Sequence, residues 1–226
     1  FSATMPNSIR KIAQQYLNDP TEVRVKTKTT TGANIRQRYM QVMHSHKLDA
    51  MTRVLEVENY DGIIVFVRTK KETEEVADKL KARGFQAAAI NGDIPQQLRE
   101  RTVDALRDGR IDILVATDVA ARGLDVERIS LVVNYDIPHD TESYVHRIGR
   151  TGRAGNKGLA VTLFSPEDTP LLEKVEAVLD TRLPQQWFPG FEPDLTREPP
   201  VSRRNSKGAQ KQKARQQALG ARGKRR

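Results

Sequence analysis

Hydrophobic and polar residues alternate in blocks along most of the chain. Short, nearly unbroken apolar runs predict strands that are buried on both faces of a sheet. Longer stretches with apolar residues at helical spacing separate these runs, as in the helix after Pro95, where Leu98, Val103 and Leu106 are predicted to face inward. The predicted strands are 63–67, 87–90, 113–116, 129–133 and 159–164, with an extended piece near 38–43. The predicted helices are 7–17, 46–57, one after Thr69, one after Pro95, 141–148 and one from Ser165 to about Asp180.

Alternating strands and helices predict an α/β fold, with a parallel sheet covered by helices on both faces. Sheets of this kind bind ligands beyond the carboxyl ends of their strands. We therefore expect the ligand-binding side chains directly after each strand. These positions, called the strand-end rim below, are 68–69, 91–93, 117–118 and 134–136.

Composition excludes several classes of protein. Of 226 residues, 37% are hydrophobic, which is enough for a folded core. The absence of cysteine excludes disulfides, thiolate nucleophiles and cysteine-based metal sites. No apolar run is long enough for a membrane span, and the start does not show the pattern of a signal peptide. Because the chain begins with Phe1, we expect that an N-terminal part is missing.

The net charge of +9 comes from the last thirty residues, which hold 11 Lys and Arg and one Glu. The remainder has 27 basic and 28 acidic residues. The tail has almost no large apolar side chain, so we expect it to be disordered when free and to bind a polyanion, above all a nucleic acid. A merely solubilising tail is the alternative. The tail residues expected to bind RNA are Arg203, Arg204, Lys207, Lys211 and Lys213.

Residues 146–153, His-Arg-Ile-Gly-Arg-Thr-Gly-Arg, form the most informative stretch. Guanidinium groups present a planar set of donors that matches phosphate oxygens. The two glycines let the backbone approach a ligand, so Arg150 and Arg153 can act from one short segment. Such arginines can neutralise charge on a transferred phosphoryl group. An ordinary surface cluster of ion pairs is the alternative.

Residues 116–125 follow a predicted strand and combine a hydroxyl, two carboxylates, Arg122 and Gly123. Asp125 could accept a hydrogen bond from a ribose hydroxyl. A helix cap, or a structural partner of Arg122, is an equally good interpretation of this carboxylate.

Taken together, these motifs resemble the C-terminal half of a DEAD-box ATP-dependent RNA helicase, from Phe1 to about Leu183. The nearest branch is the bacterial cold-shock and ribosome-assembly type, with the RhlE-like branch as the alternative. The matching segments are 1–4 (motif III), 64–69 (motif IV), 96–99 (Q-x-x-R), 116–125 (motif V), 134–138 (motif Va) and 146–153 (motif VI).

The resemblance implies a RecA-like fold and a division of the chain. Residues 1–20 would end the first RecA-like domain, and 21–34 would link it to the second. The second domain would cover 35–183, followed by an aromatic and proline-rich extension over 184–196 and the basic tail over 197–226.

The resemblance also implies roles for single residues. Arg150 and Arg153 would be arginine fingers on the ATP γ-phosphate, and Asp125 and Gly123 would bind the nucleotide. His146 would link the ATP site to the RNA site. The residues implied in RNA backbone binding are Thr69, Gly92, Asp93, Arg99 and Thr117; those implied in interdomain coupling are Ser2, Thr4, Phe66, Arg122 and Arg147. Thr69 as a helix cap and Phe66 as a core residue are the simpler alternatives.

The sequence contains no phosphate-binding loop and no Asp-Glu-Ala-Asp stretch. ATP and Mg²⁺ would therefore be held mainly by an N-terminal RecA-like domain, and this chain alone is expected to hydrolyse ATP negligibly, with no metal site of its own. Closure of the two domains on RNA would unwind short duplexes in the cytoplasm. Ribosomal precursors or the RNA-decay machinery are possible partners.

Two other functions fit the same residues. One is an RNA-binding or annealing module that acts through the tail without ATP, and the other is a protein-interaction platform. Arginines turned inward into local ion pairs, on the side of the sheet opposite the strand-end rim, would overturn the finger assignment and leave the basic tail as the only functional clue.

Overall fold

The computed structural model describes residues 7–18 and 34–186, which belong to two separate units. In the first unit, Asn7–Tyr16 forms helix α1, close to the predicted 7–17. Its apolar residues Ile9, Ile12 and Tyr16 are exposed. The second unit contains all the other elements named below.

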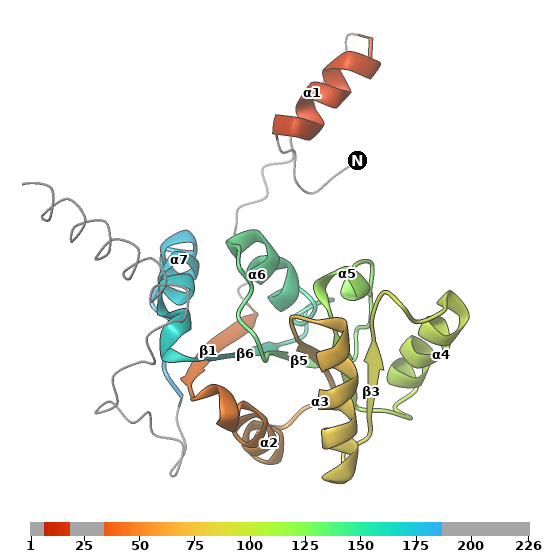
Figure 1. Cartoon of the computed structure of the whole chain (residues 1–226), viewed down its shortest axis with the longest axis vertical. Coiled ribbons are helices and arrows are strands. Elements are labelled where there is room, and N and C mark those ends of the chain that lie inside the picture. Colours follow the sequence, from red (N-terminus) through yellow and green to blue (C-terminus); the bar gives the residue numbers. More distant parts are fainter. Residues whose placement is uncertain (1–6, 19–33, 187–226) are drawn as a thin grey trace, which may run out of the picture. The chain divides into compact units, whose positions relative to one another are not determined.

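A six-stranded sheet forms the centre of the second unit (Figure 1). All neighbouring strands run parallel, in the order β1-β6-β5-β2-β4-β3. The prediction of an α/β fold with a parallel sheet is confirmed. The strands are β1 (Ile35–Gln41), β2 (Gly62–Phe66), β3 (Ala87–Ile90), β4 (Ile113–Ala116), β5 (Ile129–Asn134) and β6 (Gly158–Phe164).

Helices cover both faces of this sheet. Two of them pack on one face, and the other four pack on the opposite face. The first pair is α2 (Lys47–Val57) and α3 (Lys70–Ala82). The second group is α4 (Gln96–Arg107), α5 (Asp118–Ala121), α6 (Thr141–Ile148) and α7 (Thr169–Leu179); 3₁₀ turns at His44–His46 and Pro166–Asp168 precede α2 and α7.

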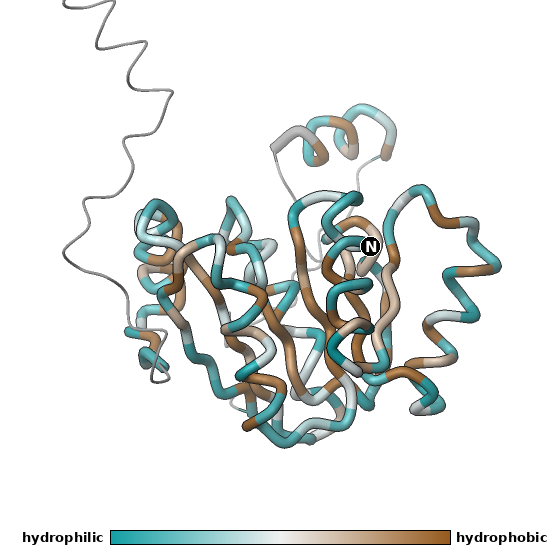
Figure 2. Tube along the Cα trace, turned by 60° about the horizontal axis from the view of Figure 1, so that its bottom comes forward, coloured by the Kyte–Doolittle hydropathy of each residue, from teal (hydrophilic) through white to brown (hydrophobic). Residues whose placement is uncertain are grey.

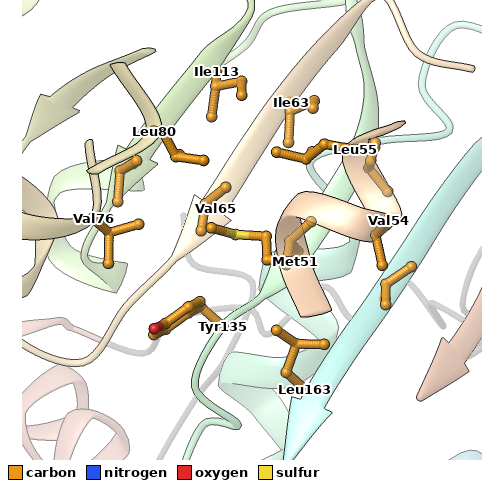
Figure 3. Packing of buried hydrophobic residues seen from close by; sticks show 14 of the residues in the cluster. Met51, Val54, Leu55, Ile63, Val65, Val76, Leu80, Ile113, Tyr135 and Leu163 are labelled. Carbon is orange, nitrogen blue, oxygen red and sulfur yellow. The ribbon is translucent and has the colours of Figure 1, made fainter. Parts of the chain in front are cut away.

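Strand β2 shows how the sequence builds both layers. Side chains alternate between the faces of a strand. Ile63 and Val65 contact the layer of α2 and α3, whereas Ile64 and Phe66 contact the other layer. Figure 3 shows the first layer, with side chains of α2 and α3 meeting those of the central strands. The hydrophobic colour in Figure 2 follows the same central strands.

Two details differ from the prediction. Leu98 is 51% exposed, although Val103 and Leu106 on the same helix are buried. The spacing thus predicted the inward positions of Val103 and Leu106 correctly, and the prediction that Leu98 faces inward is wrong. The four-residue helix α5 was not predicted, because it is too short to show a helical period.

Candidate functional site

Two threonines of the strand-end rim act as helix caps. The hydroxyl of Thr69 accepts a hydrogen bond from the Glu72 N–H (3.2 Å) at the start of α3. The hydroxyl of Thr117 accepts one from the Ala120 N–H (3.4 Å) at the start of α5. Both threonines therefore sit at positively polarised helix N-termini.

The turn after β3 carries two further predicted RNA-binding residues, Gly92 and Asp93. It is held by Asn91, which is 3% exposed. The Asn91 amide donates to the Thr73 hydroxyl (3.0 Å), and its carbonyl accepts from the Asp93 N–H (3.0 Å). Asp93 forms an ion pair with Lys70. The sequence analysis did not single out Lys70, although it adjoins Thr69 on a predicted helix start.

Arg99 lies on α4 and donates to the main-chain carbonyl of Arg122 (3.0 Å). This contact ties the start of α4 to the stretch that follows α5. The Arg122 residue itself is exposed. The structure thus gathers Arg99, Thr117 and Arg122 near the end of β4, beside the group around Thr69 and Gly92.

A buried charge cluster lies beneath this rim and was missed by the sequence analysis. Lys47 is 2% exposed and donates to Asp136 (3.0 Å), whose second oxygen accepts from the Arg68 N–H (3.1 Å). Burial raises the pKa of Asp136, but the Lys47 ammonium and the Arg68 N–H outweigh it and lower that pKa. Burial, together with the adjacent Asp136, raises the pKa of Glu72. No sequence signal marked Lys47, since a lysine at a helix start is normally exposed.

Arg147 is also buried, with 3% exposure. Its guanidinium binds both oxygens of Asp118 (2.6 and 2.7 Å) and donates to the Asp136 carbonyl (2.6 Å). It lies over the ring of Phe66, 5.0 Å from the centroid. Arg147 therefore connects α6 to the ends of β2, β4 and β5 within the domain. Its coupling role remains a prediction, and this geometry requires it to act through those neighbours.

Arg150, Arg153, Leu124 and Asp125 form a group that we call the arginine cluster. The Leu124 carbonyl accepts from Arg150 (2.8 Å) and Arg153 (3.3 Å). Arg153 pairs with Asp125 and donates to the Gly149 carbonyl (2.8 Å). Asp125 thus pairs with Arg153 rather than with Arg122. Two arginines expected at one nucleotide thus converge on a single carbonyl oxygen, and Asp125 joins them through Arg153.

Further contacts of the same segment come from His146 and Gly123. The exposed His146 offers its carbonyl to Arg150 (3.2 Å). Gly123 has a φ of +73°, a conformation that glycine adopts without strain. Burial, then the neighbouring Arg153, lower the pKa of Arg150, while Asp125 opposes them. Arginine nevertheless stays charged at any physiological pH.

The arginine cluster lies at the amino edge of the sheet, away from the strand-end rim. Thr151 donates to the carbonyl of Ile129, the first residue of β5 (2.7 Å), and Gly152 lies against the side chain of Ile35, the first residue of β1. Helix α6 leaves the carboxyl edge and runs back along the sheet. Arg153 thus forms a local ion pair, and both arginines lie at the edge opposite the strand-end rim, but neither is turned inward, because both remain partly exposed. The finger assignment stays a prediction. A nucleotide bound by these arginines would lie at the amino edge of the sheet and not at the strand-end rim.

Several predicted residues lie outside the described part of the chain. They are Ser2, Thr4, Arg203, Arg204, Lys207, Lys211 and Lys213. Within residues 7–18 and 34–186, no three His, Asp or Glu side chains gather as a metal ion would require. Among the helices of these ranges, none has the length and apolar character needed to cross a membrane.

Comparisons with known proteins agree with this fold and these motifs. The family model "Helicase conserved C-terminal domain" matches residues 46–155. The ATP-dependent RNA helicase DeaD of Mycobacterium tuberculosis is 63% identical over 192 residues, 85% of this chain and 34% of that protein. DeaD of Escherichia coli is 53% identical over 192 residues, 85% of this chain and 30% of its own length. The chain spans about a third of these relatives.

Solved structures show the same fold. E. coli DEAD-box protein SrmB, bound to regulator of ribonuclease activity A, has a TM-score of 0.67 and 35% identity, over 74% of this chain and 97% of that one. Saccharomyces cerevisiae Dbp5, bound to RNA and ADP BeF3, has a TM-score of 0.74 and 32% identity, over 82% of this chain and 50% of that one. The described sheet is thus a RecA-like helicase C-terminal domain. The chain belongs to the DEAD-box family, as its motifs predicted.

Proposed function

We propose that this chain is the C-terminal part of an ATP-dependent RNA helicase, which supplies arginine fingers and half of an RNA groove. The observation that carries this proposal is the match of residues 46–155, which include Arg150 and Arg153, to the helicase C-terminal family model. The relatives named ATP-dependent RNA helicase DeaD support it.

The hydrogen-bond donors of the arginine cluster suit the phosphate groups of a nucleotide. ATP supplies a phosphoanhydride bond, and the developing charge on its phosphoryl oxygens needs cationic donors. A guanidinium carries five N–H donors, so the local carbonyls occupy only some of those of Arg150 and Arg153. The exposed Asp125 carboxylate could exchange Arg153 for a ribose hydroxyl. We assign no metal-binding step to the described residues.

The strand-end rim fits an RNA backbone. Thr69 and Thr117 place hydroxyls and helix N-termini at one edge, and Arg99 adds a guanidinium. Among Thr69, Gly92, Arg99 and Thr117 there is no aromatic ring to stack on bases, which favours binding independent of sequence. S. cerevisiae Dbp5, which shares this fold, has been solved with RNA and ADP BeF3.

Nucleotide and RNA would bind at opposite edges of one sheet. Closure of this domain against an N-terminal RecA-like domain, with ATP and Mg²⁺ held mainly there, would bring the arginine cluster to the nucleotide and bend the RNA. We place this activity in the cytoplasm, on ribosomal precursors or in RNA decay. The basic tail favours a second candidate, ATP-independent RNA annealing.

The test is Arg150→Ala in the complete helicase, measured as RNA-stimulated ATP hydrolysis. Loss of an arginine finger lowers the rate by about 10³–10⁵-fold. The matched control is Arg110→Ala, because Arg110 forms an exposed pair with Asp108 just before β4. A rate for Arg150→Ala within about twofold of the control would overturn the finger assignment. RNA annealing that is independent of nucleotide would favour the second candidate.

A further inference from the structure

The ion pair between Lys70 and Asp93 joins the start of α3 to the turn after β3. Both side chains are largely exposed, at 54% and 70%. Gly92 lies beside this pair, since a methyl group at this position would come within 3.6 Å of the Lys70 Nζ atom. The lysine ammonium is therefore held over a stretch of backbone that carries no side chain.

The ion pair is not needed to hold this turn. The buried Asn91 already fixes it through Thr73 and through the Asp93 N–H. Exposed ion pairs contribute little to stability. Opening the pair therefore costs little folding free energy. Stability of the turn does not explain why the pair lies at this position.

The position of Asp93 conflicts with a direct role in RNA binding. A carboxylate repels phosphate, yet this one lies among groups that suit phosphate: the N-terminus of α3 at Thr69, the bare backbone of Gly92 and the ammonium of Lys70. Asp93 neutralises Lys70, the cation that lies against Gly92.

We infer that Lys70 binds a phosphate of the RNA backbone and that Asp93 competes with this phosphate for Lys70 in the free domain. Asp93 then lowers RNA affinity, so that only an RNA strand held along the rest of the rim displaces it. This inference rests on the proposed RNA-binding role of the strand-end rim. It replaces the expectation that Asp93 is itself an RNA ligand.

The experiment measures binding of single-stranded oligouridylate to the full 226-residue chain over a series of salt concentrations. Asp93→Asn is expected to tighten binding about threefold, the size of one nearby charge in water. Lys70→Ala is expected to weaken binding and to reduce the salt slope by about 0.7, the value for one phosphate contact on a single strand. In the Lys70→Ala background, Asp93→Asn should have less than half of its effect on the logarithmic scale.

The matched control is Asp78→Asn. Asp78 forms an exposed pair with Lys81 on the same helix, at 3.0 Å, so this variant makes the same change in net charge. Equal effects of Asp78→Asn and Asp93→Asn would overturn the inference, as would weaker RNA binding by Asp93→Asn, the result expected if the pair only braces the turn.

Arg99→Gln separates this inference from the proposal on which it rests. Unchanged RNA binding by Arg99→Gln would overturn the RNA role of the rim. Weaker binding by Arg99→Gln, with no tightening by Asp93→Asn, would overturn only the competition between Asp93 and phosphate.

Discussion

The strand-end rim and the arginine cluster lie at opposite edges of one sheet and offer different chemistry to the anions that we propose they bind. At the rim, helix N-termini, hydroxyls and an exposed ion pair are held above a buried charge cluster. In the arginine cluster, two guanidinium groups converge on one main-chain carbonyl. The rim suits many similar phosphates along a strand, whereas the cluster suits one concentrated charge.

Lys47→Met should destabilise the structure beneath the strand-end rim and leave the contacts of the arginine cluster unchanged. It leaves Asp136 buried without its cation, and losing one partner of a buried pair costs about 3–5 kcal/mol of unfolding free energy. Urea unfolding measures this loss. The control Lys71→Met removes a lysine whose side chain is 87% exposed and should change stability by less than about 0.5 kcal/mol. Equal stability of the two variants would show that the buried cluster does not support the rim.

Arg147→Met should disturb both regions, because Arg147 lies between them. The variant loses the paired contacts to Asp118 and the hydrogen bond to the Asp136 carbonyl, which predicts a loss of about 2–3 kcal/mol. In the complete helicase, both RNA affinity and ATP hydrolysis should fall. Arg53→Met, which removes an exposed pair on α2, provides the control. A defect confined to one of the two activities would contradict the connecting position of Arg147.

Asp140→Asn should have the smallest effect and concerns only α6, the helix between the two edges. The Ser143 N–H, 2.7 Å from the Asp140 carboxylate, lowers the pKa of Asp140. The ionised carboxylate therefore stabilises the folded state at pH values above its unfolded pKa of about 3.9. This stabilisation is lost as the pH falls through the lower pKa of the folded state. Asparagine caps a helix at any pH. Between pH 5 and 2, the variant should lose less stability than the parent, by a few tenths of a kcal/mol in thermal unfolding; identical acid profiles would contradict this.

The sequence predicted the strands and long helices well, because each is long enough to show its own period. It also singled out Thr69, Thr117, Arg150 and Arg153, whose roles remain predictions. It could not place the arginine cluster at the amino edge, since that depends on the path of α6 across the sheet. It could not reveal the burial of Lys47 or the pair of Lys70 and Asp93, because these contacts join segments far apart in the chain.

Helix α6 has eight residues, so it spans about 12 Å between the rim side and the segment that carries Arg150. One inserted residue inside it would advance that segment by about 1.5 Å and rotate it by about 100°. Arg150 and Arg153 would then point away from the Leu124 carbonyl, even though every side chain was retained. An insertion in the exposed stretch 154–157 would leave both arginines in place. The position of Arg150 and Arg153 relative to the rim is thus set by the length of one helix.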